Sequence, residues 1–312
     1  MSIVNRKMRY WLRHITRMRA TTALILLLCA LGMWIVDYVR TPEQWSAILT
    51  AQLLAAACGL GLCIVLYHAK AAEHFSLMPA ILYVAAIGVI PYLRVHWQPQ
   101  LISAVLLYFL FATRDTKDNH EPNGQVFLVT VLLCVTALWV PDALWCIVYL
   151  WIVMLLQGAF SPRTIMASLL GIALVGIYYA VAVYMGIAEI WDYHALFDRN
   201  WLGVDTPSSV TVVTGIMIAG FLTAASGAFR RSLYDLVSTR MLLYHVVMLG
   251  LVSLPLTLWT TAQPDCRALL PLALSATTSI YLLQQESETR GVSLLVYLTG
   301  AGALYTWLLL TL

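Results

Sequence analysis

The sequence predicts an all-α protein, a polytopic bundle of transmembrane helices with about 11 spans. Of its 312 residues, 61% are apolar and only 11% are charged, and the mean hydropathy is +0.82. The charged residues gather in short stretches between long apolar runs, whereas a water-soluble protein spreads them over amphipathic faces. Such a chain has too little polar surface to cover itself in water, so its expected solvent is lipid.

A helix needs about 20 apolar residues to cross a hydrocarbon core of about 30 Å. Apolar runs near this length predict spans over residues 21–36, 46–68, 77–93, 100–113, 126–140, 143–160, 164–187, 210–229, 241–259, 268–283 and 292–312. The fourth and fifth runs are short, so each is either a span with little tilt or a re-entrant segment buried in protein. Residues 21–312 are predicted to form a single transmembrane domain.

Residues 1–20 form a separate basic segment. Six apolar side chains recur along it at three- and four-residue spacing: Val4, Met8, Trp11, Leu12, Ile15 and Met18. Arginines occupy the other face, which predicts an amphipathic helix on an anionic membrane surface and disfavours a nucleic-acid-binding arm. The apolar run that follows lacks the small residues that a signal peptidase needs, so we expect it to stay as the first span.

The distribution of cations predicts the orientation independently of the span lengths. With the amino end in the cytoplasm, all but four of the 18 Lys and Arg face the cytoplasm; the exceptions are Arg40, Arg94, Arg199 and Arg267. The acidic residues divide almost evenly between the two sides, so the bias comes from the cations, as the rule requires. We therefore expect a multi-pass protein of a bacterial inner (cytoplasmic) membrane with its amino terminus inside.

Motifs for common enzyme chemistry are missing from the sequence. The six cysteines contain no CxxC pair, and no P-loop, HExxH motif or GxSxG elbow occurs. We therefore expect no metal and no organic cofactor, and whether the protein is an enzyme stays open. Small residues four apart predict close helix packing instead, at Ala55 with Gly59, Gly215 with Ala219 and Gly220 with Ala224.

Ionisable residues at the predicted outer face form the candidate site. The candidate catalytic carboxylates are Asp37, Glu43 and Asp142. The candidate substrate- or lipid-binding residues are Arg40, Arg94, His96, Trp191, Asp192, His194 and Arg199, of which the last four belong to an aromatic and acidic helix expected at the outer interface. Ordinary solvated loop charge is the alternative explanation for each of them.

Asp142 differs from the other candidates because it lies in a tight turn between two apolar spans. A charge in such a place is costly unless it is paired or used. Two roles fit this position: a functional carboxylate, or the N-cap of the sixth span.

Several short segments resemble an uncharacterised family of multi-spanning bacterial inner-membrane proteins. They are MPAILY at 78–83, Pro91, QPQLI at 98–102, WVPDAL at 139–144 and FSPR at 160–163, and the resemblance covers roughly residues 51–182. It implies a helical membrane protein, and the family has no established activity.

The order of elements is also similar to that of the multi-spanning glycosyltransferases that take sugars from polyprenyl phosphates. This similarity implies a catalytic carboxylate in the first outer loop, which acts as a general base or holds a metal against the donor phosphate. Here Asp37 and Glu43 occupy that loop, and Arg40 would contact the phosphate. The loop over residues 37–45 departs from the pattern because it is too short for the interfacial helices of those enzymes.

Three classes of function follow from these features. The missing motifs, the packing pairs and the surface helices favour a non-catalytic scaffold or partner in cell-envelope assembly, whether of lipid, glycan or secretion machinery. The outer carboxylates and the aromatic helix favour a glycosyltransferase-like enzyme whose partner is a polyprenyl phosphate or another envelope lipid. A transporter or flippase needs polar residues deep in the spans, where Gln52, Gln157 and His245 are the main candidates. The expected partners are membrane lipid and other membrane proteins.

Overall fold

The computed structural model describes residues 42–71, 75–112, 123–156, 160–187, 208–232, 237–258, 268–284 and 287–311, with a few single positions before residue 42. Every regular element in these residues is a helix, which confirms the predicted all-α class. The predicted amphipathic helix over residues 1–20 and most of the predicted first span lie outside the described residues.

The described elements are α-helices and two short 3₁₀ helices (η). In chain order they are η1 (Pro42–Gln44), α3 (Trp45–His68), α4 (Met78–Val89), α5 (Pro91–Val95), α6 (Gln98–Ala112), α7 (Asn123–Ala137), η2 (Pro141–Leu144), α8 (Trp145–Leu156), α9 (Pro162–Tyr184), α10 (Ser208–Ser232), α11 (Val237–Leu258), α12 (Leu269–Leu283) and α13 (Ser287–Thr311). Each span predicted from residue 46 onward falls on one of these helices or on a pair of them.

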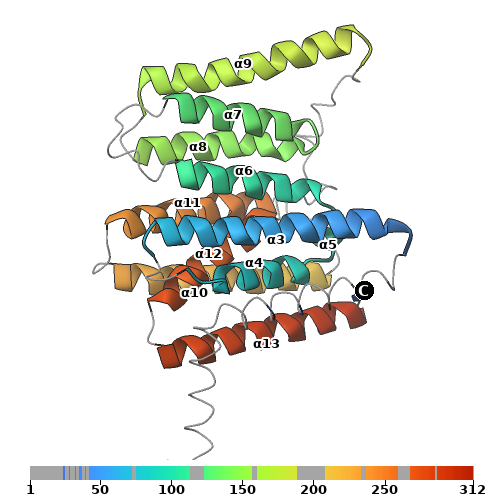
Figure 1. The fold of residues 1–312 in the computed structure, drawn as a ribbon, viewed down its shortest axis with the longest axis vertical. Helices are drawn as coiled ribbons and strands as arrows, with labels where there is room; N and C mark the ends of the chain where they lie inside the picture. Colours follow the sequence, from blue (N-terminus) through green and yellow to red (C-terminus); the bar gives the residue numbers. More distant parts are fainter. Residues whose placement is uncertain are drawn as a thin grey trace, which may run out of the picture.

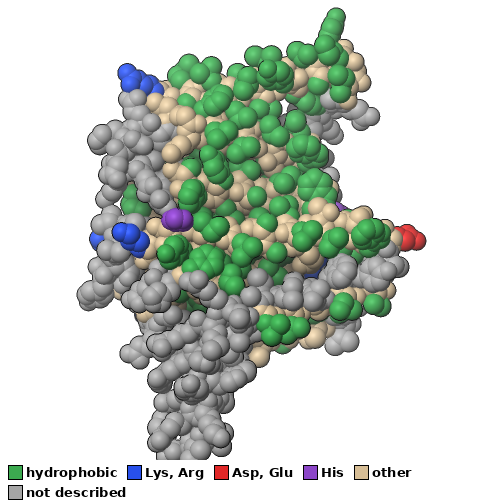
Figure 2. Space-filling view, in the orientation of Figure 1, with side chains coloured by type: hydrophobic (Ala, Val, Ile, Leu, Met, Phe, Trp, Pro, Cys, Tyr) green, Lys and Arg blue, Asp and Glu red, His purple; other side chains and the backbone are tan. Residues whose placement is uncertain are grey.

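The helices lie side by side with their axes in one general direction, so that the connections between them fall at two opposite edges (Figure 1). α9 lies at one end of the row and α13 at the other. η1 and the start of α3 lie at one edge, and α3 ends at the opposite edge. On the face shown in Figure 2, apolar side chains cover most of the surface between the two edges, and Lys and Arg side chains gather at the edge where α3 ends.

Three of the described helices are long and apolar enough to cross a membrane: Trp45–His68, Pro162–Tyr184 and Thr211–Arg230 within α10. Others are shorter, and a helix of 12 residues such as α4 rises only about 18 Å, less than the hydrocarbon core of about 30 Å. The structure therefore shows an apolar helical bundle with three helices of spanning length in its described part. The count of about 11 spans stays a prediction.

The span predicted over residues 77–93 is broken in the structure. α4 ends at Val89, Ile90 is extended (φ −96°, ψ 110°), and Pro91 begins the separate helix α5. Pro91 is the physical reason, because proline has no N–H to donate and disfavours the helical conformation in the residue before it. The short helix α5 then leads directly into the turn before α6.

α9 begins with a complete capping box. The Ser161 hydroxyl accepts a hydrogen bond from the backbone N–H of Thr164 (3.2 Å), and the Thr164 hydroxyl accepts one from the N–H of Ser161 (3.4 Å). Pro162 occupies the first helical position, where no N–H is needed. This local signal fixes the start of α9.

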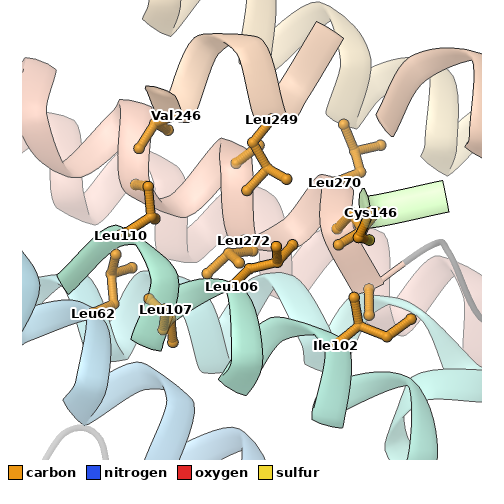
Figure 3. Close-up of a cluster of buried hydrophobic side chains, with 14 of the residues drawn as sticks. Leu62, Ile102, Leu106, Leu107, Leu110, Cys146, Val246, Leu249, Leu270 and Leu272 are labelled. Carbon is orange, nitrogen blue, oxygen red and sulfur yellow. The ribbon is translucent and has the colours of Figure 1, made fainter. Parts of the chain in front are cut away.

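The centre of the bundle is formed by α4 and α12, which contact each other. All twelve residues of α4 are buried, as is every residue of α12 except Tyr281 and Leu283. A helix that is apolar all round is suited to such a place. Figure 3 shows part of the surrounding core, where α3, α6, α8, α11 and α12 contribute Leu62, Leu106, Cys146, Leu249 and Leu272.

Glycines set how closely several of these helices approach. A Cβ on Gly59 of α3 would lie 3.0 Å from the Ala80 Cα of α4, so the predicted Ala55 and Gly59 pair does mark a close helix contact. A Cβ on Gly220 would reach Leu274 only at 3.5 Å, an ordinary contact. Gly215 differs from the prediction: nothing lies within 4 Å of its Cβ position, because that face of α10 is exposed.

Gly250 is the most tightly enclosed of these glycines, and Gly250→Ala is expected to destabilise the bundle. The added Cβ would overlap the Cζ atom of Phe221, whose ring is fully buried. Overpacking of this kind lowers the free energy of unfolding by about 1–3 kcal/mol. The measurement is thermal unfolding of the purified protein in detergent. Gly215→Ala is the control and should be at least as stable as the wild type, since its Cβ meets nothing; equal stability of both variants would contradict the packing described here.

Candidate functional site at the broken helix

Four predicted site residues fall within the described part of the chain: Glu43, Arg94, His96 and Asp142. The other six lie outside the described residues, and their roles stay predictions: Asp37, Arg40, Trp191, Asp192, His194 and Arg199. Glu43 is exposed in η1, while Arg94 and His96 lie at the end of the broken helix, beside the turn into α6.

Gln100 holds the broken helix against the rest of the bundle. Its side-chain Nε2 donates a hydrogen bond to the Leu93 carbonyl of α5 (3.1 Å), and the Cys58 thiol of α3 lies 3.7 Å from the Gln100 carbonyl. The carbonyls at the end of so short a helix have few hydrogen-bond donors within the helix, so a side chain has to donate to them. Gln100 is fully buried, and its Oε1 has no hydrogen-bond partner among the described residues.

Arg94 lies in the last turn of α5 and is only 5% exposed. The central carbon of its guanidinium group lies 4.8 Å from the centre of the Tyr305 ring of α13, which is a cation–π contact. A cation at the C-terminal end of a helix also interacts favourably with the partial negative charge there. Arg94 therefore joins α5 to the last helix of the chain.

His96 follows α5 and is partly buried against it. Its ring stacks on the Tyr92 ring, with the ring centres 4.1 Å apart and an angle of 12° between the planes. Its Nδ1 lies 3.1 Å from the Tyr92 carbonyl, and the His96 N–H donates to the same oxygen at 3.1 Å. The imidazole is therefore held in place by its own short helix.

Asp142 is 7% exposed and lies in η2, which packs against α7 and α8. Val140 occupies the N-cap position of this turn, so Asp142 lies inside the first turn and is not its N-cap. A carboxylate there still interacts favourably with the positive end of the helix. Burial in so tight a turn limits the access that a substrate would have to it.

The described candidates do not form one cluster of catalytic groups. η1 with Glu43 packs against α3, η2 with Asp142 packs against α7 and α8, and α5 with Arg94 packs against α3 and α4. Within the described residues, no group of three or more His, Cys, Asp or Glu side chains is placed to hold a metal ion.

Comparisons with known protein families, with characterised proteins and with solved structures find no match. The two family resemblances stated from the sequence therefore stay predictions.

The sequence did not single out Gln100 or Tyr305 as partners of the candidate residues. Gln100 is a polar residue at the start of an apolar helix, close after Pro91 and Pro99, and that combination is the signal that a helix break needs a side-chain donor. Tyr305 carries no such signal, because its contact with Arg94 depends on where α13 packs.

Gln100→Leu is expected to lower the free energy of unfolding by about 1–3 kcal/mol, the usual cost of leaving a buried carbonyl without its donor. The carbonyl concerned is that of Leu93. Thermal unfolding in detergent measures the change, and Gln98→Leu in the same turn of α6 is the control. If the two variants unfold at the same temperature, Gln100 does not hold the broken helix.

Proposed function

We propose that the protein is a multi-pass protein of the bacterial inner membrane that serves as a non-catalytic scaffold or partner in cell-envelope assembly. Three helices of spanning length and an apolar surface support the membrane part of this proposal. Four cations support the orientation, because they lie at or near helix ends on the edge of the bundle where α3 ends: Lys70, Arg163, Arg230 and Arg240. A cytoplasmic face is expected to gather cations in this way.

The observation that carries the scaffold proposal is the exposure of α9. In an apolar stretch of 18 residues within α9, only 11% of the residues are buried. One face of α9 packs on α7 through Gly171, whose Cβ position is 3.1 Å from the Phe127 carbonyl oxygen. On the same side, the Ser168 hydroxyl accepts a hydrogen bond from Trp151 Nε1 (3.1 Å) and bonds to the Thr130 hydroxyl (3.2 Å).

The free face of α9 carries small residues at helical spacing: Ala173, Gly176 and Ala180 are all exposed, and nothing lies within 4 Å of the Cβ position of Gly176. Helices in lipid associate through small residues, because these let two backbones approach closely. α9 thus uses one glycine to pack on its own bundle and presents a second small-residue face that suits a helix of another protein.

The burial of the candidate chemical groups also supports a scaffold over an enzyme. Arg94 is covered by Tyr305, and Asp142 is enclosed in its turn. A sugar or a phosphate has to reach its catalytic carboxylate and its cation at once. In the described residues these groups are separated on η1, η2 and α5, and Arg94 contacts Tyr305 of α13, which favours a structural role for Arg94.

A glycosyltransferase-like enzyme remains the second candidate. The broken helix favours it, because irregular backbone deep in an apolar bundle is often found where a substrate binds. That hypothesis requires Glu43→Gln or Asp142→Asn to abolish sugar transfer from a polyprenyl phosphate while the protein still accumulates. For a transporter, Gln52, Gln157 and His245 would have to line a polar path. Gln157 lies outside the described residues, and Gln52 and His245 are buried, at 8% and 4% exposed.

Gly176→Leu tests the scaffold. Nothing lies within 4 Å of the Cβ position of Gly176, so the variant should accumulate and unfold like the wild type. A partner that is present in fixed stoichiometry after mild detergent extraction of the wild type should be lost. Gly171→Leu is the matched variant on the inner face of α9; it should lower thermal stability, because its Cβ would press on α7. Recovery of the wild type as a lone monomer, or an unchanged partner with Gly176→Leu, would overturn the proposal.

A further inference from the structure

A groove of about 300 Å³ lies on the surface between α3 and α6. It is open on one side and lined mainly by apolar atoms. Its walls include three residues of α3, Ala57, Gly61 and Ile64, and three residues of α6, Ala104, Tyr108 and Phe111. In each helix the three residues are four and then three positions apart. The two helices run in the same direction (Figure 1), and the Cβ position of Gly61 lies 3.5 Å from Leu107 Cδ1. The small side chains of Ala57, Gly61 and Ala104 leave the space.

The groove has the length of one membrane leaflet. Its lining residues on α3 run from Leu54 to Val65, which is roughly 16 Å at 1.5 Å per residue. A hydrocarbon core of about 30 Å gives about 15 Å to each leaflet. All the α3 lining residues except Leu54 lie in the second half of that helix, so the groove belongs to the leaflet on the side where α3 ends.

Cationic and aromatic residues stand at that end of the groove. The His68 ring makes an edge contact with Phe111, one of the groove residues, with the ring centres 5.5 Å apart. Lys70 follows two residues later, and both His68 and Lys70 are exposed. The end of the apolar groove toward the end of α3 therefore has a basic residue, Lys70, close to it.

Lys70 has a backbone conformation that lysine seldom adopts, with φ at +57°. It occupies the left-handed position of a Schellman motif, in which the Lys70 N–H donates to the Tyr67 carbonyl and the Ala71 N–H to the Leu66 carbonyl, both at 3.1 Å. Glycine is preferred there because a Cβ is strained. The end of α3 is fixed further by Thr239 of α11, whose hydroxyl donates to the Ala69 carbonyl (3.2 Å). A strained residue kept at such a position points to a role for its side chain.

We propose that the groove between α3 and α6 binds one acyl chain of an anionic phospholipid of the cytoplasmic leaflet, whose phosphate is held by Lys70 and His68. The assignment to that leaflet rests on the orientation in the proposed function. Charge complementarity selects an anionic lipid over a zwitterionic one, since a basic side chain at the surface attracts anionic headgroups. The apolar lining and its length select an acyl chain.

Native mass spectrometry of the full chain, released from mild detergent, tests this site with phosphatidylglycerol and phosphatidylethanolamine of identical acyl chains. The wild type should retain one phosphatidylglycerol in preference to phosphatidylethanolamine. Lys70→Gly should reduce that preference about fivefold, the contribution of one basic residue near a headgroup. Its thermal stability without lipid should be equal or higher, because glycine relieves the left-handed backbone. Lys70→Arg should keep the preference.

Gly61→Leu tests the groove itself. Alanine would fit at this position, with its Cβ 3.5 Å from Leu107 Cδ1, whereas a leucine side chain fills the space and should displace both lipids. Gly215→Leu, on an exposed face of α10, should leave both lipids bound. Retention of phosphatidylglycerol by Gly61→Leu, or an unchanged preference in Lys70→Gly, would overturn the proposal. Gly176 lies on α9 and outside the groove lining, so a wild type that is recovered without a protein partner but with its lipid retained would count against the scaffold alone.

Discussion

An apolar bundle has no water inside with which to satisfy its backbone, so each N–H and C=O needs a partner within the protein. The helices meet most of this requirement, and side chains complete it where a helix ends or breaks. The Gln100 amide donates a hydrogen bond to the Leu93 carbonyl at the end of α5. The Thr239 hydroxyl donates one to the Ala69 carbonyl beyond α3. Hydroxyls inside helices bond back to their own turns, as Thr130 does to the Val126 carbonyl at 2.8 Å. The buried polar side chains can therefore be understood first as parts of the fold.

The second determinant is how closely the helix backbones approach. Gly59, Gly171 and Gly250 each lie where a Cβ would press on a neighbouring helix. Other small residues face outward, and they have a different consequence. Gly176 leaves an open face on α9, and Gly61 helps to form the groove beside α6. The same residue type thus builds contacts inside the bundle and leaves sites at its surface, which connects packing with the two proposals for function.

Most helix positions could be predicted from the sequence, because long apolar runs bounded by charge or proline determine them. The run over 46–68 became α3 at Trp45–His68, and the 164–187 run became α9, whose capping residues Ser161 and Thr164 fix its start. The break at Ile90 differs from the continuous span predicted over residues 77–93, because it depends on a single residue, Pro91, within an otherwise apolar run. The packing role of Gly215 was also misjudged, because spacing along one helix does not say which face meets a neighbour.

The candidate site was predicted less well than the fold. Charge and position singled out Arg94 and Asp142, but their burial depends on Tyr305 of α13 and on the packing of η2 with α7 and α8. Such contacts join segments far apart in the chain and leave no local pattern. The groove between α3 and α6 could not be predicted for the same reason. Each helix alone has the sequence of an ordinary apolar span, and the space forms only where the two helices pack together.

The most direct measurement of the central claim is the location of the two edges of the bundle relative to the membrane. Alkaline phosphatase and green fluorescent protein fused in turn after Lys70, His96, Ile187 and Ser232 report whether each point is outside or inside the cell. If the edge where α3 ends faces the cytoplasm, the fusions after Lys70 and Ser232 are fluorescent, and the fusions after His96 and Ile187 have phosphatase activity. Phosphatase activity after Lys70 and Ser232, or a purified chain that stays monodisperse without detergent, would contradict the central claim.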